Sequence, residues 1–404
     1  MAKFERLRAA DVAVQEARTA EEQVKALVAR GALQSDLGLA TAGLEDLLRA
    51  YVHHKSQTKE PDPRLGQQKL SDLLPVYEKK SPQGPAWLVA QLGEAFRIYA
   101  RDVSLSKTDP SEVNRFSKHA LDCFNNAIAE HRAGDGLAWM EAHCAAVYTM
   151  RYWMSLVKNG RGDGDLFDSA EKGFEAAISA SPNGYVWATR FLAFLYALRG
   201  ASLEPQGHAD YVKQARERLS QVETEDKYDQ SSLNRSIAML YSYDTFLPNL
   251  AHDSREASAD ESISRALQAV EQDPEDFMAS YFGAASLWWL ARHGKSNAAY
   301  RDRLEATLEG AQIRSINALS QAATTLAGIA VMRNDKELAG VAMKLFETIP
   351  PDLETRAMMS LDPVFRSEDP DVRERIREFG LEKQLQSFCD KFSIKRQKPA
   401  KEKS

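Results

Sequence analysis

One set of residues in the sequence has the types and the spacing of metal ligands. His119 and Cys123 lie four residues apart, and His143 is followed directly by Cys144. Histidine nitrogen and cysteine sulfur are donors that zinc prefers in proteins. Adjacent residues on a helix point in different directions, however, and cysteine packs well in an apolar interior. Because Cys123 precedes Phe124 and Cys144 lies among alanines, we predict structural roles for these residues and expect no metal or cofactor.

Motifs that carry catalysis or nucleotide binding are missing from the sequence. It has no GxGxxG, GxxxxGKS/T, HExxH or GxSxG pattern. The glycine- and aspartate-rich segment Asn159–Asp165 lacks the twelve-residue pattern of a calcium-binding loop, and we interpret it as a connection between helices. No pair of carboxylates stands out as an acid and base couple. The sequence therefore predicts a protein that is not an enzyme. The alternative is a hydrolase built on a ring of helices with carboxylates at its centre.

Composition and charge narrow the range of partners. The 404 residues carry 52 lysines and arginines against 58 aspartates and glutamates, a net charge of −6. A general nucleic-acid-binding protein needs a basic face to neutralise phosphates, so this balance argues against that class. The three cysteines form no CxxC pair and the charged N-terminus shows no secretory signal, so we expect a cytoplasmic protein. The most apolar segment, Ala279–Ala291, is shorter than the ~20 residues of a membrane-spanning helix and predicts a buried helix.

Apolar residues recur at spacings of three and four along most of the chain, which is the helical period. We therefore predict an all-α fold of roughly fifteen to seventeen helices. Serine or threonine followed three residues later by glutamate predicts helix starts at Thr19 and Ser258. Aspartate before proline predicts further starts at Asp109 and Asp369.

Residues 1–105 differ from the rest of the chain and are predicted to form an N-terminal helical region. We expect a long helix at Phe4–Ala29 and a second at Leu37–His54. The polar segment His54–Arg64 contains two prolines and predicts a linker. A further helical pair is expected at Leu65–Lys79 and Pro85–Val103. This region could hold degenerate repeats or form a separate cap.

A repeated pattern begins after this region. Ala170, Phe174, Ala177 and Pro182 fall at offsets 0, 4, 7 and 12. Two small residues two turns apart allow a neighbouring helix to approach, the phenylalanine fills the space between them, and the proline ends the helix. Related spacings begin at four other positions: Ala120, Ala215, Ser262 and Ala342.

This pattern resembles the second helix of a tetratricopeptide repeat (TPR). The resemblance covers Ser111–Pro350 and implies an α-α superhelix, a solenoid of antiparallel helix pairs, over residues 106–350. The first positions of the copies are 45 to 80 residues apart, farther than the ~34 residues of a TPR and overlapping the range of HEAT and armadillo repeats. Leu361–Leu381 resembles the DP-x-F…DP…GL segment that closes many bacterial TPR arrays, which implies a capping segment at 351–390 with a terminal helix.

The register that the resemblance implies places the first helix of each repeat along a concave face. Position 9 of the repeat then carries small residues, namely Cys144, Ala193, Ala238 and Ala285. The larger residues at positions 5 and 12 predict a groove that binds a partner, formed by Met140, Val147, Tyr196, Tyr241, Tyr281 and Trp288. An aromatic stripe at helical spacing can equally belong to a core. Positions 2 and 5 carry no lysine or arginine, which disfavours capture of a C-terminal carboxylate of the kind seen in chaperone-binding TPR domains.

The basic segment 391–404 lacks apolar periodicity and predicts a disordered tail. The tail could contact nucleic acid, an anionic membrane or an acidic partner, or could only keep the chain in solution. The leading hypothesis, which the resemblance implies, is a scaffold or a regulatory or adaptor subunit that binds a protein or peptide in its concave groove. A nucleic-acid-associated α-solenoid and the helical-ring hydrolase are the alternatives.

Overall fold

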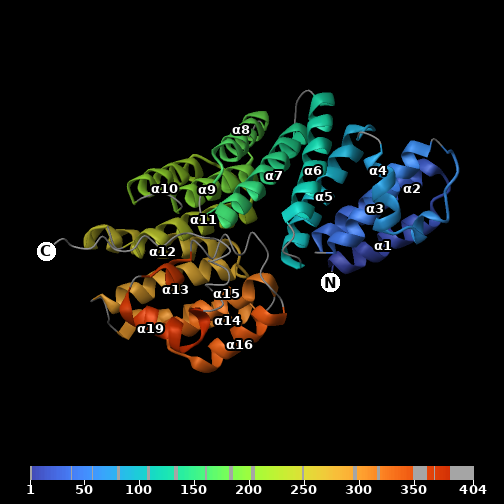
Figure 1. Cartoon of the computed structure of the whole chain (residues 1–404). Coiled ribbons are helices and arrows are strands. Elements are labelled where there is room, and N and C mark those ends of the chain that lie inside the picture. Colours follow the sequence, from blue (N-terminus) through green and yellow to red (C-terminus); the bar gives the residue numbers. More distant parts are fainter. Residues whose placement is uncertain are drawn as a thin grey trace. The chain divides into compact units, whose positions relative to one another are not determined.

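The described part of the chain contains eighteen α-helices, one 3-10 helix and no β-strand (Figure 1). The computed structural model describes residues 2–37, 39–56, 58–79, 82–106, 110–131, 135–159, 162–181, 185–201, 205–247, 250–293, 298–315, 319–348, 362–367 and 369–382. The prediction of an all-α fold is confirmed. The basic segment 391–404 lies outside these ranges.

The helices divide into two compact units. Unit 1 comprises Met1–Arg151 and Lys172–Pro182, and unit 2 comprises Tyr152–Glu171 and Asn183–Ser404. Helices α7 (Asp135–Asn159) and α8 (Gly164–Ala180) contribute residues to both units. The boundaries predicted at residues 105, 350 and 390 stay predictions.

Besides residues of α7 and α8, unit 1 contains α1 (Ala2–Glu16), α2 (Ala20–Asp36), α3 (Ala40–Ser56), η1 (Leu65–Gln67), α4 (Leu70–Glu78), α5 (Ala86–Ser106) and α6 (Pro110–Glu130). Helix α2 packs on α3 and α5 packs on α6, and α5 also packs on α3.

The prediction of a single long helix at Phe4–Ala29 is wrong, because the structure has two helices there, α1 and α2. The Thr19 hydroxyl accepts a hydrogen bond from the Glu22 amide, and the Glu22 carboxylate accepts one from the Thr19 amide, at 3.2 and 3.1 Å. This capping box, predicted from the sequence, ends the chain's first helix and begins α2.

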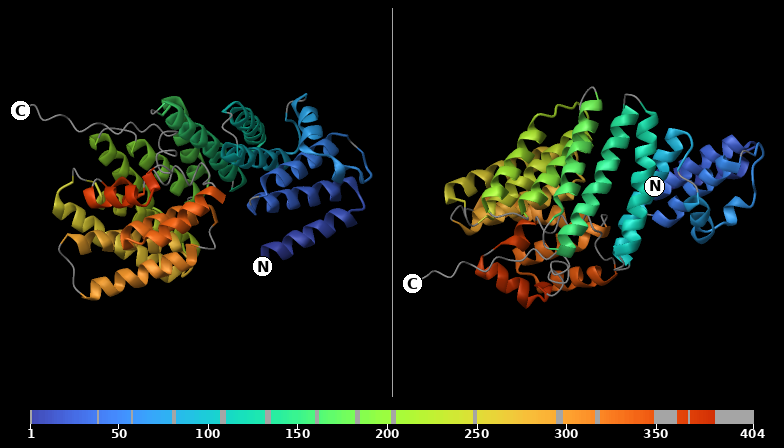
Figure 2. Two further views of the ribbon diagram at one scale, coloured as in Figure 1. Left: turned by 60° about the horizontal axis from the view of Figure 1, so that its bottom comes forward. Right: turned by 45° about the horizontal axis from the view of Figure 1, so that its top comes forward.

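Unit 2 continues the pairing, with each helix packed on its neighbour in sequence. It contains α9 (Val186–Ala201), α10 (Pro205–Ser220), α11 (Lys227–Thr245), α12 (His252–Gln272), α13 (Phe277–Arg292), α14 (Ala298–Ser315), α15 (Leu319–Arg333) and α16 (Lys336–Thr348). The first helices of successive pairs also pack on one another: α11 contacts α9 and α13, and α13 contacts α15 (Figure 2). These first helices therefore form a continuous layer within the unit.

The repeated pattern lies where the sequence predicts close helix packing. Ala170, Phe174 and Ala177 on α8 are all fully buried, whereas Pro182 lies outside the described residues. In unit 2, a Cβ atom at Gly283 of α13 would lie 2.8 Å from the Cβ of Ala266 on α12, a separation that only glycine permits. The small positions thus let paired helices approach closely. The chain has a TPR-like helical-repeat fold, as predicted.

The repeats are longer than those of a TPR. The first helices of successive pairs begin at residues 86, 135, 186, 227, 277 and 319, and these starts are 41 to 51 residues apart. The excess lies partly in the helices, because α7 has 25 residues and α12 has 21. The helix start predicted at Ser258 is wrong. Helix α12 already begins at His252, and the residues between His252 and Ser258 include no glycine or proline that would interrupt it.

The closing segment forms a terminal cap on α15. Helices α18 (Pro363–Arg366) and α19 (Pro370–Glu378) both pack on α15. The side chain of Asp369 accepts the Asp371 amide at 2.9 Å and so begins α19, as predicted, whereas Asp109 lies outside the described residues. Arg375 donates to the carbonyl of Val331 at 3.0 Å, near the C-terminal end of α15.

No helix within the described ranges combines the length and the apolar character needed to cross a membrane. The apolar segment Ala279–Ala291 lies within α13, whose residues Ala279 to Leu290 are buried. The predicted buried helix is therefore confirmed.

Candidate functional site

Most of the residues predicted to line a groove are buried between helices. Tyr241 is half-buried, and the exposed fractions of the others are 3% for Met140, 0% for Val147, 3% for Tyr196, 1% for Tyr281 and 6% for Trp288. Met140 and Val147 belong to unit 1, and the others belong to unit 2. Partner binding through these six residues stays a prediction.

The polar ends of the buried tyrosines have partners inside unit 2. The Tyr196 hydroxyl donates to the Glu171 carboxylate at 2.7 Å, and the Tyr281 hydroxyl donates to Asp362 at 2.8 Å. An arginine guanidinium lies 4.6 Å from the ring centre of Tyr241. These contacts give the aromatic residues a role in holding helices together.

The histidines and cysteines considered as zinc ligands each have another neighbour in unit 1. His119 pairs with Glu78, and His143 pairs with Glu94, both at 2.8 Å. The Cys123 thiol lies 3.3 Å from a tyrosine hydroxyl. Burial raises the pKa of this thiol, and that of the other cysteine in the set, to about 12. No three of these four donor atoms, all within the described residues, lie within 4.8 Å of one another, so their geometry does not match a zinc site.

A different group of metal-type donors lies at the start of α12. The donor atoms of His252, Asp253 and Glu256 lie within 4.8 Å of one another. His252 and Asp253 are exposed, and the His252 ring packs 5.4 Å from that of Trp289. Exposed carboxylates are common on the first turn of a helix, where the helix dipole favours them. We assign no ion to this group.

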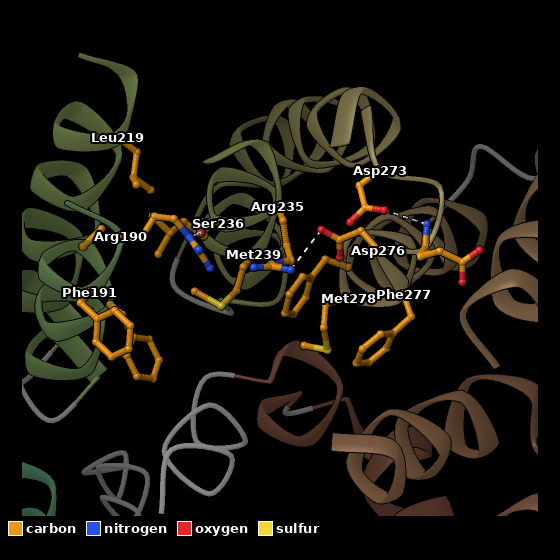
Figure 3. Close-up of a pocket in the computed structure, with 15 residues that line it drawn as sticks. Arg190, Phe191, Leu219, Arg235, Ser236, Met239, Asp273, Asp276, Phe277 and Met278 are labelled. Atoms are coloured by element: carbon orange, nitrogen blue, oxygen red, sulfur yellow. Dashed lines mark hydrogen bonds and ion pairs between the residues drawn. The ribbon is translucent and has the colours of Figure 1, made fainter. Parts of the chain in front are cut away.

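A pocket of about 260 Å³ lies in unit 2 between α9, α11 and α13 (Figure 3). Three of its aromatic residues, Phe191, Phe194 and Phe277, are half-buried and line the pocket. The remaining apolar lining comes from Ala193, Leu219, Met239, Leu240, Met278 and Phe282. The pocket therefore lies on the layer of first helices, the layer that the sequence predicts to be the binding face.

Two arginines from neighbouring helices enter the pocket. Arg190 of α9 reaches α11 and donates to the Ser236 hydroxyl at 3.2 Å. Arg235 of α11 donates to the Asp276 carboxylate, at the start of α13, at 3.1 Å. Burial and nearby Asp226 raise the pKa of Asp229, on the first turn of α11, and Arg190 acts in the opposite direction. Arg190 therefore links α9 to α11, and Arg235 links α11 to the start of α13.

The carboxylates of the pocket support the local fold. Asp276 caps α13 by accepting the Ala279 amide at 3.0 Å, and it also accepts the Ser231 hydroxyl at 3.2 Å. Asp273 accepts the amide of Glu275 at 3.1 Å. Asp276 thus ties the first turn of α13 to α11, because its two oxygens accept from both helices. A carboxylate with both oxygens engaged in this way is poorly placed to act as a catalytic base.

No protein-family model and no curated protein sequence matches the chain. The chain is similar to solved structures of low sequence identity. A monomeric mutant of IFIT1 with Gppp-AAAA is 14% identical over 91% of this chain and 80% of that chain, with a TM-score of 0.44. Yeast Tom70 is 13% identical over 94% of this chain and 86% of that chain, with a TM-score of 0.35.

The sequence reading missed the arginines of the pocket. Arg190 and Arg235 each lie three residues before a small residue of the position 9 row, Ala193 and Ala238 respectively. They therefore hold the same repeat position on consecutive first helices. This shared position is a signal that could have been found in the sequence, although it falls outside the rows taken to face a partner.

Proposed function

We propose that this chain is a non-enzymatic scaffold that binds a partner protein through a peptide segment seated in the unit 2 pocket. The main support is the lining of the pocket, which combines aromatic and methionine side chains with charged groups from α9, α11 and the turn before α13. Pockets for drug-sized ligands measure roughly 300–1,000 Å³. A volume of about 260 Å³ suits one or two peptide side chains better than a cofactor.

The half-buried residues Phe191, Phe277 and Met278 are the contacts expected to anchor an apolar side chain of the partner. Aromatic residues dominate the energetics of protein interfaces, and methionine adapts its shape to the group that it contacts. Phe191 is held in place by packing against Trp187, with ring centres 4.1 Å apart and ring planes tilted by 31°. An anchor fixed in this way loses little conformational entropy on binding.

The polar groups of the pocket favour binding over catalysis. The Asp276 carboxylate is engaged as a helix cap and in an ion pair with Arg235, and Asp273 holds a turn. A hydrolase would need a pair of carboxylates directed at one substrate position. The Asp276 carboxylate instead holds α13 against α11.

A selection from a random peptide library displayed on phage tests the proposal. The full chain is immobilised, and a selected peptide is synthesised and titrated against variants. Replacing Phe191 and Phe277 together with alanine should weaken binding at least tenfold, because each lost anchor in a hot spot costs roughly 1–2 kcal/mol. Circular dichroism shows whether the variant keeps its helices.

Tyr228→Ala is the matched control, because this aromatic residue of α11 is 72% exposed and does not line the pocket. It should leave the affinity unchanged. If the Phe191 and Phe277 double variant binds as tightly as the natural chain, or if Tyr228→Ala weakens binding equally, the pocket is not the binding site. If no peptide is enriched, the proposed function fails.

A further inference from the structure

The closing segment of unit 2, described over 362–367 and 369–382, lies on the layer of first helices. Helix α18 packs on α11 and α15, α19 packs on α15, and Asp362 accepts a hydrogen bond from Tyr281 of α13 (Figure 1). Three successive helices of the layer therefore contact the segment. Because the sequence predicts this layer to be the binding face, the chain's own segment lies where a partner is expected.

Two of the six residues predicted to line a groove are tied to this segment, one directly and one through an arginine. The Tyr281 hydroxyl donates to the Asp362 carboxylate at 2.8 Å. The Arg292 guanidinium lies 5.1 Å from the ring centre of Trp288 and pairs with the carboxylate of Asp369 at 2.9 Å. The polar contacts of the segment thus fall on the groove residues of α13.

Residues of the layer, rather than of the segment, position both donors. Gly328 of α15 leaves the space for the Tyr281 hydroxyl, because a Cβ atom at this glycine would overlap that oxygen. The Trp288 ring supports the Arg292 guanidinium by a cation–π contact. Donors that are fixed in this way lose little conformational entropy on binding, as expected of a preorganised binding site.

The segment has the chemistry of a ligand that is already folded locally. Asp362 and Asp369 each precede a proline, and each begins a helix by accepting the amide two residues later at 2.9 Å. The apolar side chains of the segment are buried, namely Val364, Phe365, Val372, Ile376 and Leu381. The segment thus offers carboxylates to the two donors and apolar side chains to the helices.

We propose that this face of α11, α13 and α15 binds a partner protein through an Asp-Pro-x-Phe segment with a second Asp-Pro seven residues after the first, and that the chain's own copy fills the site until such a partner displaces it. The proposal goes beyond the unit 2 pocket and does not depend on it. A tethered ligand competes at an effective concentration of roughly millimolar. A partner must therefore reproduce both carboxylates and the aromatic residue.

A labelled peptide that competes with the tethered segment tests the proposal. The peptide has the sequence of residues 362–382 and carries fluorescein on an added C-terminal lysine, and fluorescence anisotropy follows its binding to the full chain. Phe365→Ala in the full chain weakens the tethered copy. This variant should bind the peptide at least about tenfold more tightly than the natural chain, because a larger fraction of the chains then has an open site.

A second variant weakens the tethered segment without removing a buried apolar group. It carries asparagine in place of Asp369 and Asp371, whose side chains are 25% and 69% exposed. It should bind the peptide about two- to fivefold more tightly than the natural chain, as expected from the loss of partly exposed ion pairs. Circular dichroism shows whether each variant keeps its helices.

A change in the layer itself should have the opposite effect. Adding Arg292→Gln to Phe365→Ala should weaken peptide binding about two- to fivefold. A peptide with asparagine at both positions that pair with Arg292 should not respond to this change, because it lacks the carboxylates. The matched control is Arg303→Gln, which changes an exposed arginine of α14 and should leave the affinity unchanged.

Peptide binding that is equally weak for the natural chain and for both segment variants would overturn the proposal, and the segment would then be only a structural cap. Equal effects of Arg292→Gln and Arg303→Gln would also overturn it. Dimers of the natural chain that excess peptide dissociates in sedimentation experiments would make a second copy the occupant instead of a partner. Replacing Phe191 and Phe277 with alanine should not change peptide binding, which separates this site from the pocket.

Discussion

Replacing Asp362 with asparagine should change how the stability of unit 2 depends on pH. Asp362 accepts hydrogen bonds from the Tyr281 hydroxyl at 2.8 Å and from the amides of Val364 and Phe365 at 2.9 and 3.3 Å. Burial is the largest influence on this carboxyl group, and it raises the pKa of Asp362 to about 7 although the three hydrogen bonds act in the opposite direction. The folded chain therefore holds a proton that the unfolded chain releases.

The sign and size of the effect follow from this pKa difference. Because the folded-state pKa is raised, the contribution of Asp362 to the free energy of unfolding is most favourable below pH ~4. That contribution is lost as the pH rises through about 7. One pKa unit corresponds to about 1.4 kcal/mol. The free energy of unfolding therefore falls by about 4 kcal/mol in total, and about 3 kcal/mol of this decrease occurs between pH 5 and pH 8.

Urea unfolding followed by tryptophan fluorescence at several pH values between 5 and 8 measures the change. The free energy of unfolding of Asp362→Asn, relative to the natural chain, should rise by about 3 kcal/mol over this range, because asparagine does not titrate. Asp226→Asn is the matched control. Asp226 also caps a helix by accepting the amides two and three residues later, but it is exposed.

A difference between Asp362→Asn and the natural chain that stays constant within about 0.5 kcal/mol from pH 5 to pH 8 would show that the carboxyl group does not titrate in this range. The argument from burial would then be refuted. A rise of similar size for Asp226→Asn would also refute it, because that side chain shares the capping geometry and lacks the burial.

Two further predictions concern the interior. A Cβ atom at Gly328 would lie 2.0 Å from the Tyr281 hydroxyl, so Gly328→Ala should lower the free energy of unfolding by about 2–3 kcal/mol in urea titrations, whereas Gly340→Ala, with no atom within 4 Å, should not lower it. Cys123 and Cys144 should resist labelling by DTNB at pH 8 in the native protein and react in urea, because burial raises the pKa of both thiols to about 12. Rapid labelling of both residues in the native chain would contradict that assignment.

The helix pairs could be predicted from the sequence because they depend on local spacing. Ala170, Phe174 and Ala177 are buried as their offsets indicate, and the Thr19 capping box forms. Exact boundaries were harder to predict. Ser258 matches a capping pattern but lies inside α12, since a pattern of four residues cannot show whether the helix has already begun.

The pocket could not be predicted because it depends on contacts between helices that are distant in sequence. Arg190 and Arg235, taken singly, resemble charged residues on a solvated face. Only the packing of α9, α11 and α13 brings them into one pocket. The burial of Tyr196 and Tyr281 was open for the same reason, because helical spacing places an aromatic residue on a face without showing what covers that face.

The closing segment has a consequence for the order in which the chain folds. Tyr281 and Asp362 are 81 positions apart, and Arg375 binds the carbonyl of Val331, 44 positions earlier. The paired helices contact near neighbours in sequence, and such contacts form faster than those that close a long loop. We therefore expect the pairs to form as they leave the ribosome and the segment to dock last. Until then the Tyr281 hydroxyl lacks its carboxylate partner, so a stalled or truncated chain would leave this part of the newly made protein open to chaperones.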